Sequence, residues 1–138
     1  MAISGLIITF NEEKMIGKCI DALFRVCDEV IIVDSLSKDR TVEIAKAKGA
    51  IVIEQPFLGD GPQRSHGLPF CKNDWILNLD ADEFLDADAE DYILKEKYEG
   101  LGSGFANFLI YERGQLIFRR AYLWPARMQF EVRSAGIN

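Results

Sequence analysis

The sequence predicts an α/β fold with a central, mainly parallel sheet flanked by helices. Short apolar runs alternate with segments of helical periodicity, and three such runs fall within the first 55 residues. That order requires right-handed crossovers between parallel strands. The 138 residues, 49% of them hydrophobic and 28% charged, suffice to bury one self-sufficient core. We therefore expect a single domain over residues 1–138.

Four segments have the pattern of buried parallel strands. Each is short and almost wholly apolar, as expected for a strand that helices cover on both faces. Polar residues follow each run and mark where the strand ends. The expected strands are Ile3–Thr9, Glu29–Val33, Ala50–Glu54 and Trp75–Leu79.

Three helices are expected between these strands. Asn11 is a natural N-cap for the first helix, and the two glutamates after it suit the positive end of the helix dipole. The second helix is expected over Arg40–Lys48, with Gly49 as its C-cap signal. The third is a short helix over Pro62–Leu68, because proline suits the first turn of a helix.

The sequence after the fourth strand predicts one more helix and a late antiparallel hairpin. Residues 86–98 carry acids in their first turns and lysines in their last, as the helix dipole prefers. Glycines at 100, 102 and 104 mark a soft joint. Phe105–Glu112 and Gln115–Tyr122 are expected to be strands that pair around Gly114.

The charge is distributed unevenly along the chain. The net charge of −6 argues against nucleic-acid binding as the main role. Residues 1–100 hold 20 acids and 11 bases, whereas residues 101–138 hold two acids and five arginines. Seven of the acids fall within Asp80–Asp91. Such a block is either a solvated face or part of a metal site.

The start of the chain indicates a cytoplasmic protein, and the cysteines indicate free thiols in the core. Three cysteines without zinc-type spacing (Cys19, Cys27 and Cys71) are interpreted as buried free thiols. Met1–Ser4 lacks the basic start of a signal peptide, and no apolar run approaches the roughly 20 residues of a membrane span.

The strongest chemical signal is a pair of carboxylates after the fourth expected strand. In an open parallel sheet, ligands bind at the carboxyl ends of the strands, where Asp34 and Asp80 both fall. Asp80 and Asp82 lie two residues apart and repel one another unless a cation is present. Mg²⁺ and Mn²⁺ take one or two carboxylates together with substrate phosphates. The pair therefore indicates a nucleotide diphosphate bridged by a cation, or alternatively a capped, solvated loop.

Other familiar site residues give weaker signals. Arg64 precedes the fourth strand, where it could contact a phosphate or a base, although a surface arginine is the simpler reading. His66, the only histidine, is interpreted as structural because it has no evident partner. The glycine motifs of P-loop and dinucleotide-binding proteins are absent, which argues against both classes.

Four ordered motifs make the chain resemble a known family. It resembles family 2 glycosyltransferases of the GT-A fold, and among them the bacterial enzymes that build the lipopolysaccharide inner core. The resemblance covers about residues 3–95, and members of the family normally run well beyond 138 residues, so this chain looks short for the family. The motifs are Ile7–Glu13, Val30–Thr41, Gln63–Arg64 and Asp74–Glu83.

The resemblance implies a role for particular residues. It places Asp34 against the nucleotide base, Arg64 near base and phosphates, and Asp82 as a direct metal ligand, with Asp80 near ribose or metal. The metal ligands implied are Asp82 and Asp80. The nucleotide-sugar-binding residues implied are Thr9, Asn11, Glu12, Asp34, Arg64 and Asp80.

The resemblance also implies a reaction. A sugar would pass, with inversion, from a nucleotide-diphosphate sugar (a UDP-sugar first) to a glycan, a lipid-linked acceptor or the lipopolysaccharide core, assisted by Mg²⁺ or Mn²⁺. Residues 1–99 would bind the nucleotide sugar, and residues 100–138 would form a partial acceptor side. The family's catalytic base is an Asp or Glu after the D-x-D strand, for which Glu112 and Glu131 are weak candidates. The arginine-rich end is interpreted as contacting an anionic acceptor or the inner face of the cell membrane.

Three alternatives remain at this stage. The nearest is a truncated, non-catalytic domain that binds nucleotide sugars. A response-regulator receiver would need an aspartate at the end of strand three, where Glu54–Pro56 stands. A nucleotidyltransferase would need a glycine- and lysine-rich loop after strand one, which the sequence lacks.

Overall fold

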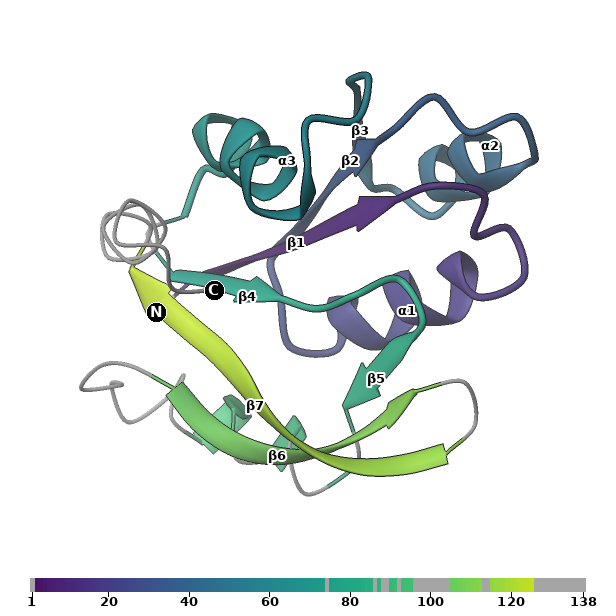
Figure 1. Cartoon of the computed structure of the whole chain (residues 1–138). Helices are drawn as coiled ribbons and strands as arrows, with labels where there is room; N and C mark the ends of the chain where they lie inside the picture. The colour runs from purple at the N-terminus through teal and green to yellow at the C-terminus, as the bar shows by residue number, and fades with distance from the viewer. Residues whose placement is uncertain are drawn as a thin grey trace.

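The computed structural model describes residues 2–73, 75–85, 87, 90–91 and 93–95, and the backbone of two later strands. Residues 87, 90–91 and 93–95 are helical, within the helix expected over 86–98, and the rest of that helix lies outside the described residues. The elements in Figure 1 are β1 (Ile3–Thr9), α1 (Ile16–Phe24), β2 (Glu29–Asp34), α2 (Thr41–Ala47), β3 (Ile51–Glu54), α3 (Asp60–Gly67), the 3₁₀ turn η1 (Leu68–Phe70), β4 (Trp75–Asn78), β5 (Glu83–Leu85), β6 (Phe105–Glu112) and β7 (Gln115–Pro125).

The described strands form one seven-stranded sheet in the order β3-β2-β1-β4-β7-β6-β5. The first four are parallel, which confirms the predicted central sheet. β7 pairs antiparallel with β4, and β6 pairs antiparallel with both β7 and β5. The residues that join β6 to β7, at 113–114, lie outside the described part of the chain. β4 and β5 are neighbours in sequence but lie on opposite sides of the β7–β6 pair.

Parallel register brings the polar ends of the strands to one edge of the sheet. Thr9 of β1 lies opposite Asp34 of β2, and Asp34 lies opposite Glu54 of β3. β4 ends at Asn78, so the chain turns away from the sheet directly into Asp80. The strands thus deliver their last residues to the edge where the sequence predicted a ligand.

Helices cover both faces of the parallel strands because the strand residues are apolar on both sides. Ile7 and Ile32 belong to the core beneath α1 and α2, where they are fully buried. Leu6, Ile31 and Val33 form the core of the opposite face, beside α3 and η1. Figure 1 shows α1 and α3 on opposite sides of the sheet.

Gly67 allows α3 to lie very close to the sheet. A Cβ atom at this position would lie 2.6 Å from Leu6 Cδ1 and 2.6 Å from Val33 Cγ2, far inside normal contact. Both side chains are completely buried and have no solvent to move into. The absence of a side chain at Gly67 therefore sets how near α3, and the residues it carries, can approach β1 and β2.

The expected N-cap of the first helix is wrong. α1 begins at Ile16, with Met15 as its N-cap, rather than after Asn11. Asn11 instead adopts a left-handed backbone (φ 51°), and its side-chain oxygen accepts a hydrogen bond from the Lys38 amide at 2.8 Å. Its own amide donates to Ser37 Oγ at 2.8 Å. Asn11 is thus occupied by contacts with a distant loop and cannot cap a helix.

The cysteines are free thiols, as predicted, but only two of the three are buried. All three are free thiols; Cys19 and Cys27 are buried and Cys71 is half-buried. Burial raises the pKa of Cys19 far above its usual range, and nearby carboxylates, Glu83 first, add to this effect. Burial, supported by Glu29, raises the pKa of Cys71 to about 12. The thiols of Cys19 and Cys71 therefore stay protonated at neutral pH, and a protonated thiol is a poor nucleophile.

Within the described part of the chain, no helix combines the length and the apolar character that crossing a bilayer requires.

Candidate ligand-binding site

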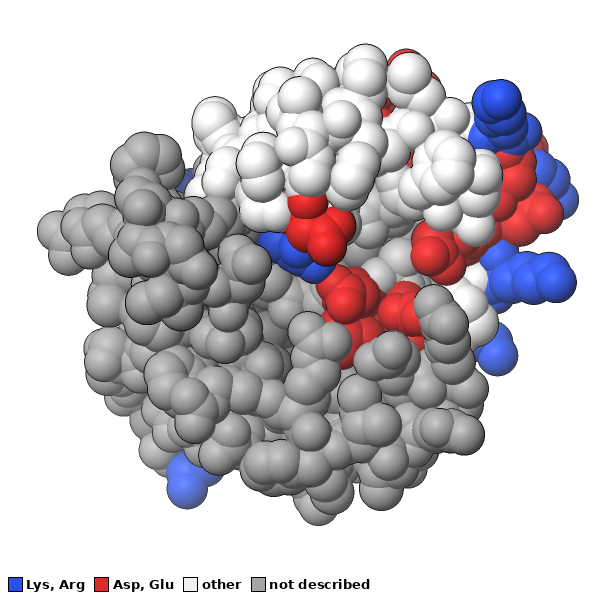
Figure 2. Space-filling model, in the orientation of Figure 1, with Lys and Arg blue, Asp and Glu red and all other residues white. Residues whose placement is uncertain are grey.

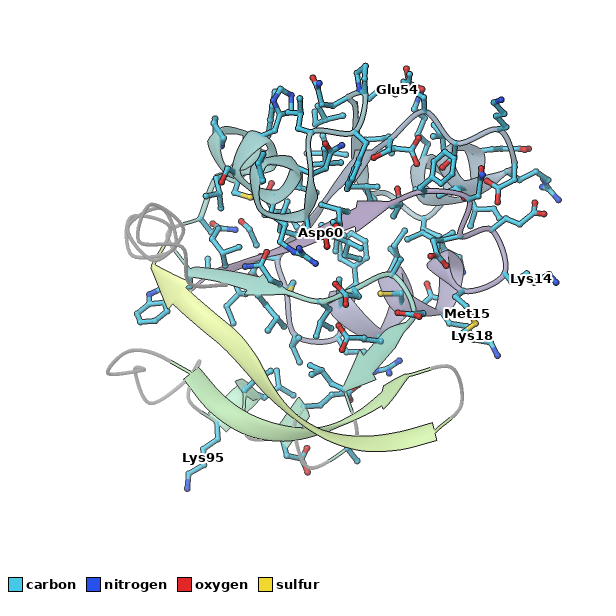
Figure 3. All side chains as sticks on the ribbon, in the orientation of Figure 1. Lys14, Met15, Lys18, Glu54, Asp60 and Lys95 are labelled. Carbon is cyan, nitrogen blue, oxygen red and sulfur yellow. The ribbon has the colours of Figure 1, made fainter. Side chains whose placement is uncertain are left out.

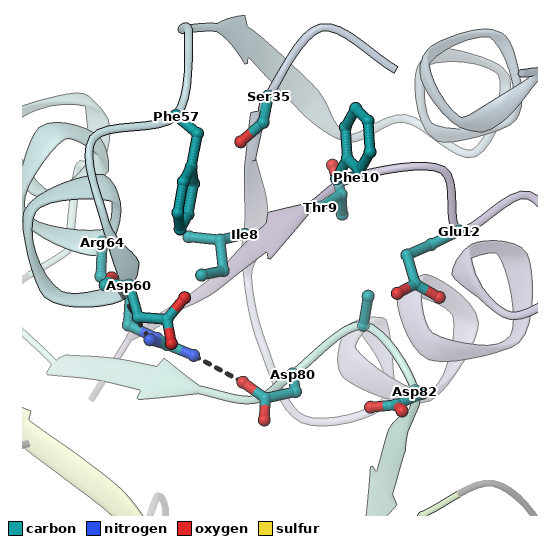
Figure 4. Close-up of a pocket in the computed structure, with 11 residues that line it drawn as sticks. Ile8, Thr9, Phe10, Glu12, Ser35, Phe57, Asp60, Arg64, Asp80 and Asp82 are labelled. Atoms are coloured by element: carbon teal, nitrogen blue, oxygen red, sulfur yellow. Dashed lines mark hydrogen bonds and ion pairs between the residues drawn. The ribbon is translucent and has the colours of Figure 1, made fainter. Parts of the chain in front are cut away.

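A cavity of about 320 Å³ opens at the carboxyl edge of the parallel strands (Figure 4). Its walls come from the loops after β1, β2 and β3, from the start of α3 and from the turn after β4. This is the place where open α/β sheets bind ligands, and the volume suits a small-molecule site. The described residues that line it are Ile8, Thr9, Phe10, Glu12, Ser35, Phe57, Asp60, Arg64, Asp80, Ala81 and Asp82.

A buried glutamate shapes the acidic turn that follows β4. The Asp80 amide donates to Glu83 Oε1 at 2.7 Å, and the Glu83 amide donates back to the Asp80 carbonyl at 3.0 Å. Glu83 has no exposed surface. These reciprocal bonds close the turn, so that Asp80 and Asp82 both line the cavity.

Arg64 extends from α3 to the acidic turn. Its Nη2 lies 2.5 Å from Asp80 Oδ1, and its Nη1 donates to the Asp60 carbonyl at 3.3 Å. The Arg64 side chain is 21% exposed and the Asp80 side chain 39%. The structure therefore brings together two of the predicted site residues, from segments 16 positions apart, in one partly buried ion pair.

The cavity carries an excess of negative charge. Its described lining holds four carboxylates and one cation, Arg64. Figure 2 shows acidic side chains gathered around the hollow in the middle of this face, with a basic side chain beside them. In Figure 4, Glu12 and Asp82 lie on one side of the cavity, whereas Asp60 and Asp80 lie near the arginine.

The donor set fits a hard divalent cation. Asp80 and Asp82 offer the oxygen ligands that Mg²⁺ and Mn²⁺ prefer. Across the described residues, no three His, Cys, Asp or Glu side chains are grouped so as to hold an ion by themselves. Two carboxylates completed by phosphate oxygens are the usual arrangement for these ions, and the two aspartates that line the cavity match it.

Asp34 is not among the described residues that line the cavity. It is fully buried, and its Oδ1 accepts hydrogen bonds from Thr9 Oγ1 at 2.7 Å and Ser37 Oγ at 2.6 Å. Its Oδ2 accepts from the Ser37 amide at 2.8 Å. The carboxylate thus fastens the end of β1 to the loop after β2. The predicted contact of Asp34 with a nucleotide base stays a prediction.

The loops after β1 and β2 are joined by further hydrogen bonds. The Glu12 amide donates to Thr41 Oγ1 at 2.8 Å, and the Glu13 amide donates to Asp39 Oδ2 at 3.1 Å. Asn11 takes part in the same joint, as described above, and is not among the residues that line the cavity. Glu12 and Thr9 do line it. Figure 3 shows Lys14, Met15 and Lys18 pointing outward from this region.

Six of the described lining residues had no role in the sequence-based prediction: Ile8, Phe10, Ser35, Phe57, Asp60 and Ala81. Phe10 and Ser35 follow Thr9 and Asp34 directly, so their place at the strand ends was the available signal. Phe57 and Asp60 belong to the segment after β3, whose carboxyl end reaches the same edge. Phe57 is 60% exposed and Phe10 54% exposed, and in Figure 4 the two rings lie on either side of Ser35. Figure 3 shows Asp60 pointing toward the interior of this face.

Glu112 and Glu131 stay predictions as candidates for the catalytic base, because the structure describes only the backbone of Glu112. The backbone of Glu112 pairs with Glu83 at the end of β6. Glu131 lies outside the described residues. His66 is not among the described residues that line the cavity, and its ring centroid lies 6.1 Å from that of Phe70.

Comparison with known proteins defines the class of this chain. An open parallel sheet with a polar cavity at its carboxyl edge is the arrangement of ligand-binding α/β domains. The family model named Glycosyl transferase family 2 matches residues 4–134. The chain therefore belongs to glycosyl transferase family 2, as its motifs predicted.

Relatives in curated collections carry matching descriptions. A protein described as an uncharacterized glycosyltransferase from Rickettsia bellii is 43% identical over 118 residues, which are 86% of this chain and 39% of the relative. The lipopolysaccharide core biosynthesis glycosyltransferase LpsC of Rhizobium meliloti is 38% identical over 91 residues, 62% of this chain and 33% of that protein. The chain thus spans about a third to two fifths of the length of these relatives.

Solved structures confirm the predicted GT-A fold. Glucosyl-3-phosphoglycerate synthase from Mycobacterium tuberculosis, in complex with Mn²⁺, UDP and phosphoglyceric acid, aligns with a TM-score of 0.61 and 26% identity. The alignment covers 75% of this chain and 41% of that one. S. aureus TarS 1-349 aligns with the same TM-score at 23% identity, over 72% of this chain and 33% of that one.

Proposed function

We propose that this chain binds a nucleotide-diphosphate sugar, with a UDP-sugar as the first expectation, and transfers the sugar with inversion to a glycan or lipopolysaccharide-core acceptor. Family membership supports glycosyl transfer in general. The observation that carries the finer proposal is the convergence of Asp80, Asp82 and Arg64 on one cavity at the carboxyl edge of the sheet.

A divalent cation is part of the proposal. Asp80 and Asp82 would hold it, and the cation would offset the negative charge that develops on the departing diphosphate. The similarity to a synthase solved with Mn²⁺ and UDP supports this assignment. Glu83 would keep both aspartates in place through the bonds that close the turn.

The remaining residues of the cavity suit a nucleotide. Thr9 and Ser35 offer hydroxyl groups, and Arg64 offers the planar donor fork that recognises phosphate oxygens. Phe10 and Phe57 present exposed rings at the cavity. Transfer also needs a base to take the proton of the acceptor hydroxyl, and Glu112 and Glu131 stay candidates for it.

Acceptor and location belong to the same proposal. The similarity to LpsC supports an acceptor in the lipopolysaccharide core. We propose a cytoplasmic location, with peripheral contact at the inner face of the cell membrane made by the five arginines after residue 100. Binding to anionic vesicles that weakens as salt rises is expected, and binding that salt does not change contradicts the electrostatic contact.

Calorimetry of UDP binding tests the nucleotide site. UDP is titrated into the wild-type chain with and without Mn²⁺, and then into a variant with Asp80→Ala and Asp82→Ala. We expect binding that needs Mn²⁺ and is lost in the double variant. Asp21→Asn is the matched control, because it removes one carboxylate of an exposed surface pair with Lys48. Binding that is metal-independent, or that survives the double substitution, would refute the site.

Turnover of the donor separates the enzyme from the alternative of a nucleotide-sugar-binding domain without activity. UDP-glucose is incubated with the chain and Mn²⁺, and released UDP is measured. Release above the level of the double aspartate variant supports the enzyme. Tight UDP binding with no release in the presence of a core-oligosaccharide acceptor supports the binding domain.

A further inference from the structure

We infer that Arg64 acts as an internal counter-cation that occupies Asp80 in the ligand-free chain, so that a divalent metal binds well only together with a diphosphate. This inference rests on the proposed function of the cavity. It assigns to Arg64 an exchange between two partners, the carboxylate of Asp80 and the phosphate oxygens of the ligand. Arg64 is thereby a positioning residue for the metal as well as a contact of the nucleotide.

The first argument is the geometry of the pair. Arg64 Nη2 lies 2.5 Å from Asp80 Oδ1, one of the oxygens that the metal would need. Nη1 of the same guanidinium donates a hydrogen bond to the Asp60 carbonyl. Figure 4 shows the guanidinium lying beneath Asp60 and directed at Asp80. A cation that approaches Asp80 therefore meets a positive charge that is already in place.

The second argument is the charge of the cavity. Four carboxylates and one arginine leave the described lining with an excess of three negative charges. A diphosphate alone is repelled by this lining, whereas a metal alone is attracted by it and opposed by Arg64. When both ligands are present, the guanidinium can turn to a phosphate oxygen and Asp80 becomes available to the cation. Each ligand then improves the binding of the other, and by thermodynamic linkage the two gains are equal.

The third argument is that the pair can exchange partners at low cost. The Asp80 side chain is 39% exposed and the Arg64 side chain 21% exposed, so neither charge is sealed inside the protein. An ion pair that water reaches contributes little net stability, and its partners separate readily. A fully buried pair would instead leave an uncompensated charge on opening.

The test measures Mn²⁺ binding without any nucleotide, by electron paramagnetic resonance of free Mn²⁺ at low salt. In Arg64→Gln we expect Mn²⁺ to bind about tenfold more tightly than in the wild type, because the substitution removes a positive charge that contacts Asp80 and would repel a divalent cation held there. Arg64→Lys keeps the charge and is expected to stay within twofold of wild type. Arg25→Gln removes the arginine of the surface pair with Glu90 and is the control for net charge.

A second measurement gives the opposite sign. With Mn²⁺ saturating, UDP binding to Arg64→Gln is expected to weaken by tenfold or more, because a phosphate donor is lost. A gain in Mn²⁺ affinity below twofold overturns the inference, whatever happens to UDP binding, and leaves Arg64 as a simple phosphate contact. Failure of the wild type to bind UDP with Mn²⁺ overturns the proposed function instead, and the nucleotide-free measurement still decides the role of Arg64. Thermal melting of each variant identifies any loss of folding.

Discussion

Gly67→Ala is expected to destabilise the chain and also to weaken the ligand site. The new Cβ would lie 2.6 Å from one carbon each of Leu6 and Val33, about 1 Å short of normal carbon–carbon contact. Neither side chain can swing into solvent, because both are fully buried. α3 must therefore move away from the sheet, and Arg64 moves with it.

The magnitude follows from two opposing effects. Overpacking a well-filled core costs about 1–3 kcal/mol. Alanine favours a helix over glycine by up to about 1 kcal/mol, and less at the last residue of α3. The net loss is then about 1–2 kcal/mol of unfolding free energy, or roughly 3–10 °C in the melting temperature of a chain this size.

Thermal and urea unfolding measure this loss, and Gly17→Ala is the matched control. Gly17 also lies in a helix, but a Cβ there would meet Ile44 Cγ2 at an ordinary 3.4 Å. We expect Gly17→Ala to be neutral or stabilising. UDP affinity in Mn²⁺ should fall in Gly67→Ala and not in Gly17→Ala. Equal effects of the two substitutions would refute the steric argument for Gly67.

Three further predictions concern the hydrogen bonds and thiols. Glu83→Ala should weaken UDP binding in the presence of Mn²⁺ by at least tenfold. Glu83→Gln keeps an acceptor for the Asp80 amide and should retain most of the affinity. Equal losses of affinity in calorimetry would contradict a role for the hydrogen bond between the Asp80 amide and Glu83. Thr9→Val should lower the free energy of unfolding by about 1–3 kcal/mol in urea, because buried Asp34 loses a hydrogen-bond donor. Thr9→Ser keeps the hydroxyl group and should lower it by less. A larger loss in Thr9→Ser than in Thr9→Val would contradict this role of the hydroxyl group. Burial raises the pKa of Cys71 from 9.0 to about 12, so the folded chain keeps a thiol proton that the unfolded chain loses. The free energy of unfolding should therefore fall as pH rises from 9 to 12, and it should fall less steeply in Cys71→Ala. If Cys71→Ala has the same pH dependence of stability as the wild type, this assignment is contradicted.

The parallel half of the fold could be predicted from the sequence almost to the residue. Ile3–Thr9 and Glu29–Asp34 are apolar on both faces because helices cover both, and such runs have few other interpretations. The start of α1 could not be predicted this way. Asn11 has the chemistry of an N-cap, but Ser37 and Lys38, more than 25 residues away, take up its hydrogen bonds.

The site could be predicted in outline from where the strands end. Asp80, Asp82 and Arg64 meet in one cavity because parallel register gathers the carboxyl ends of strands. The short strand β5 escaped prediction, because three residues give no periodicity and its partner β6 lies more than 20 residues later. The ion pair between Arg64 and Asp80 could not be predicted from the sequence either, because it depends on how closely α3 approaches the sheet.

The strand order has a consequence for how the chain is made. The acidic turn joins β4 to β5, and these strands are held apart in the sheet by β7 and β6, which leave the ribosome later. β1, β2 and β3 can pair while synthesis is still under way, because each connection among them is local. The far end of the turn is fixed only when residues 105–112 have emerged to pair with β5. A nascent chain can thus form its parallel scaffold first, whereas the segment after Asp80 and Asp82 finds its partner strand last.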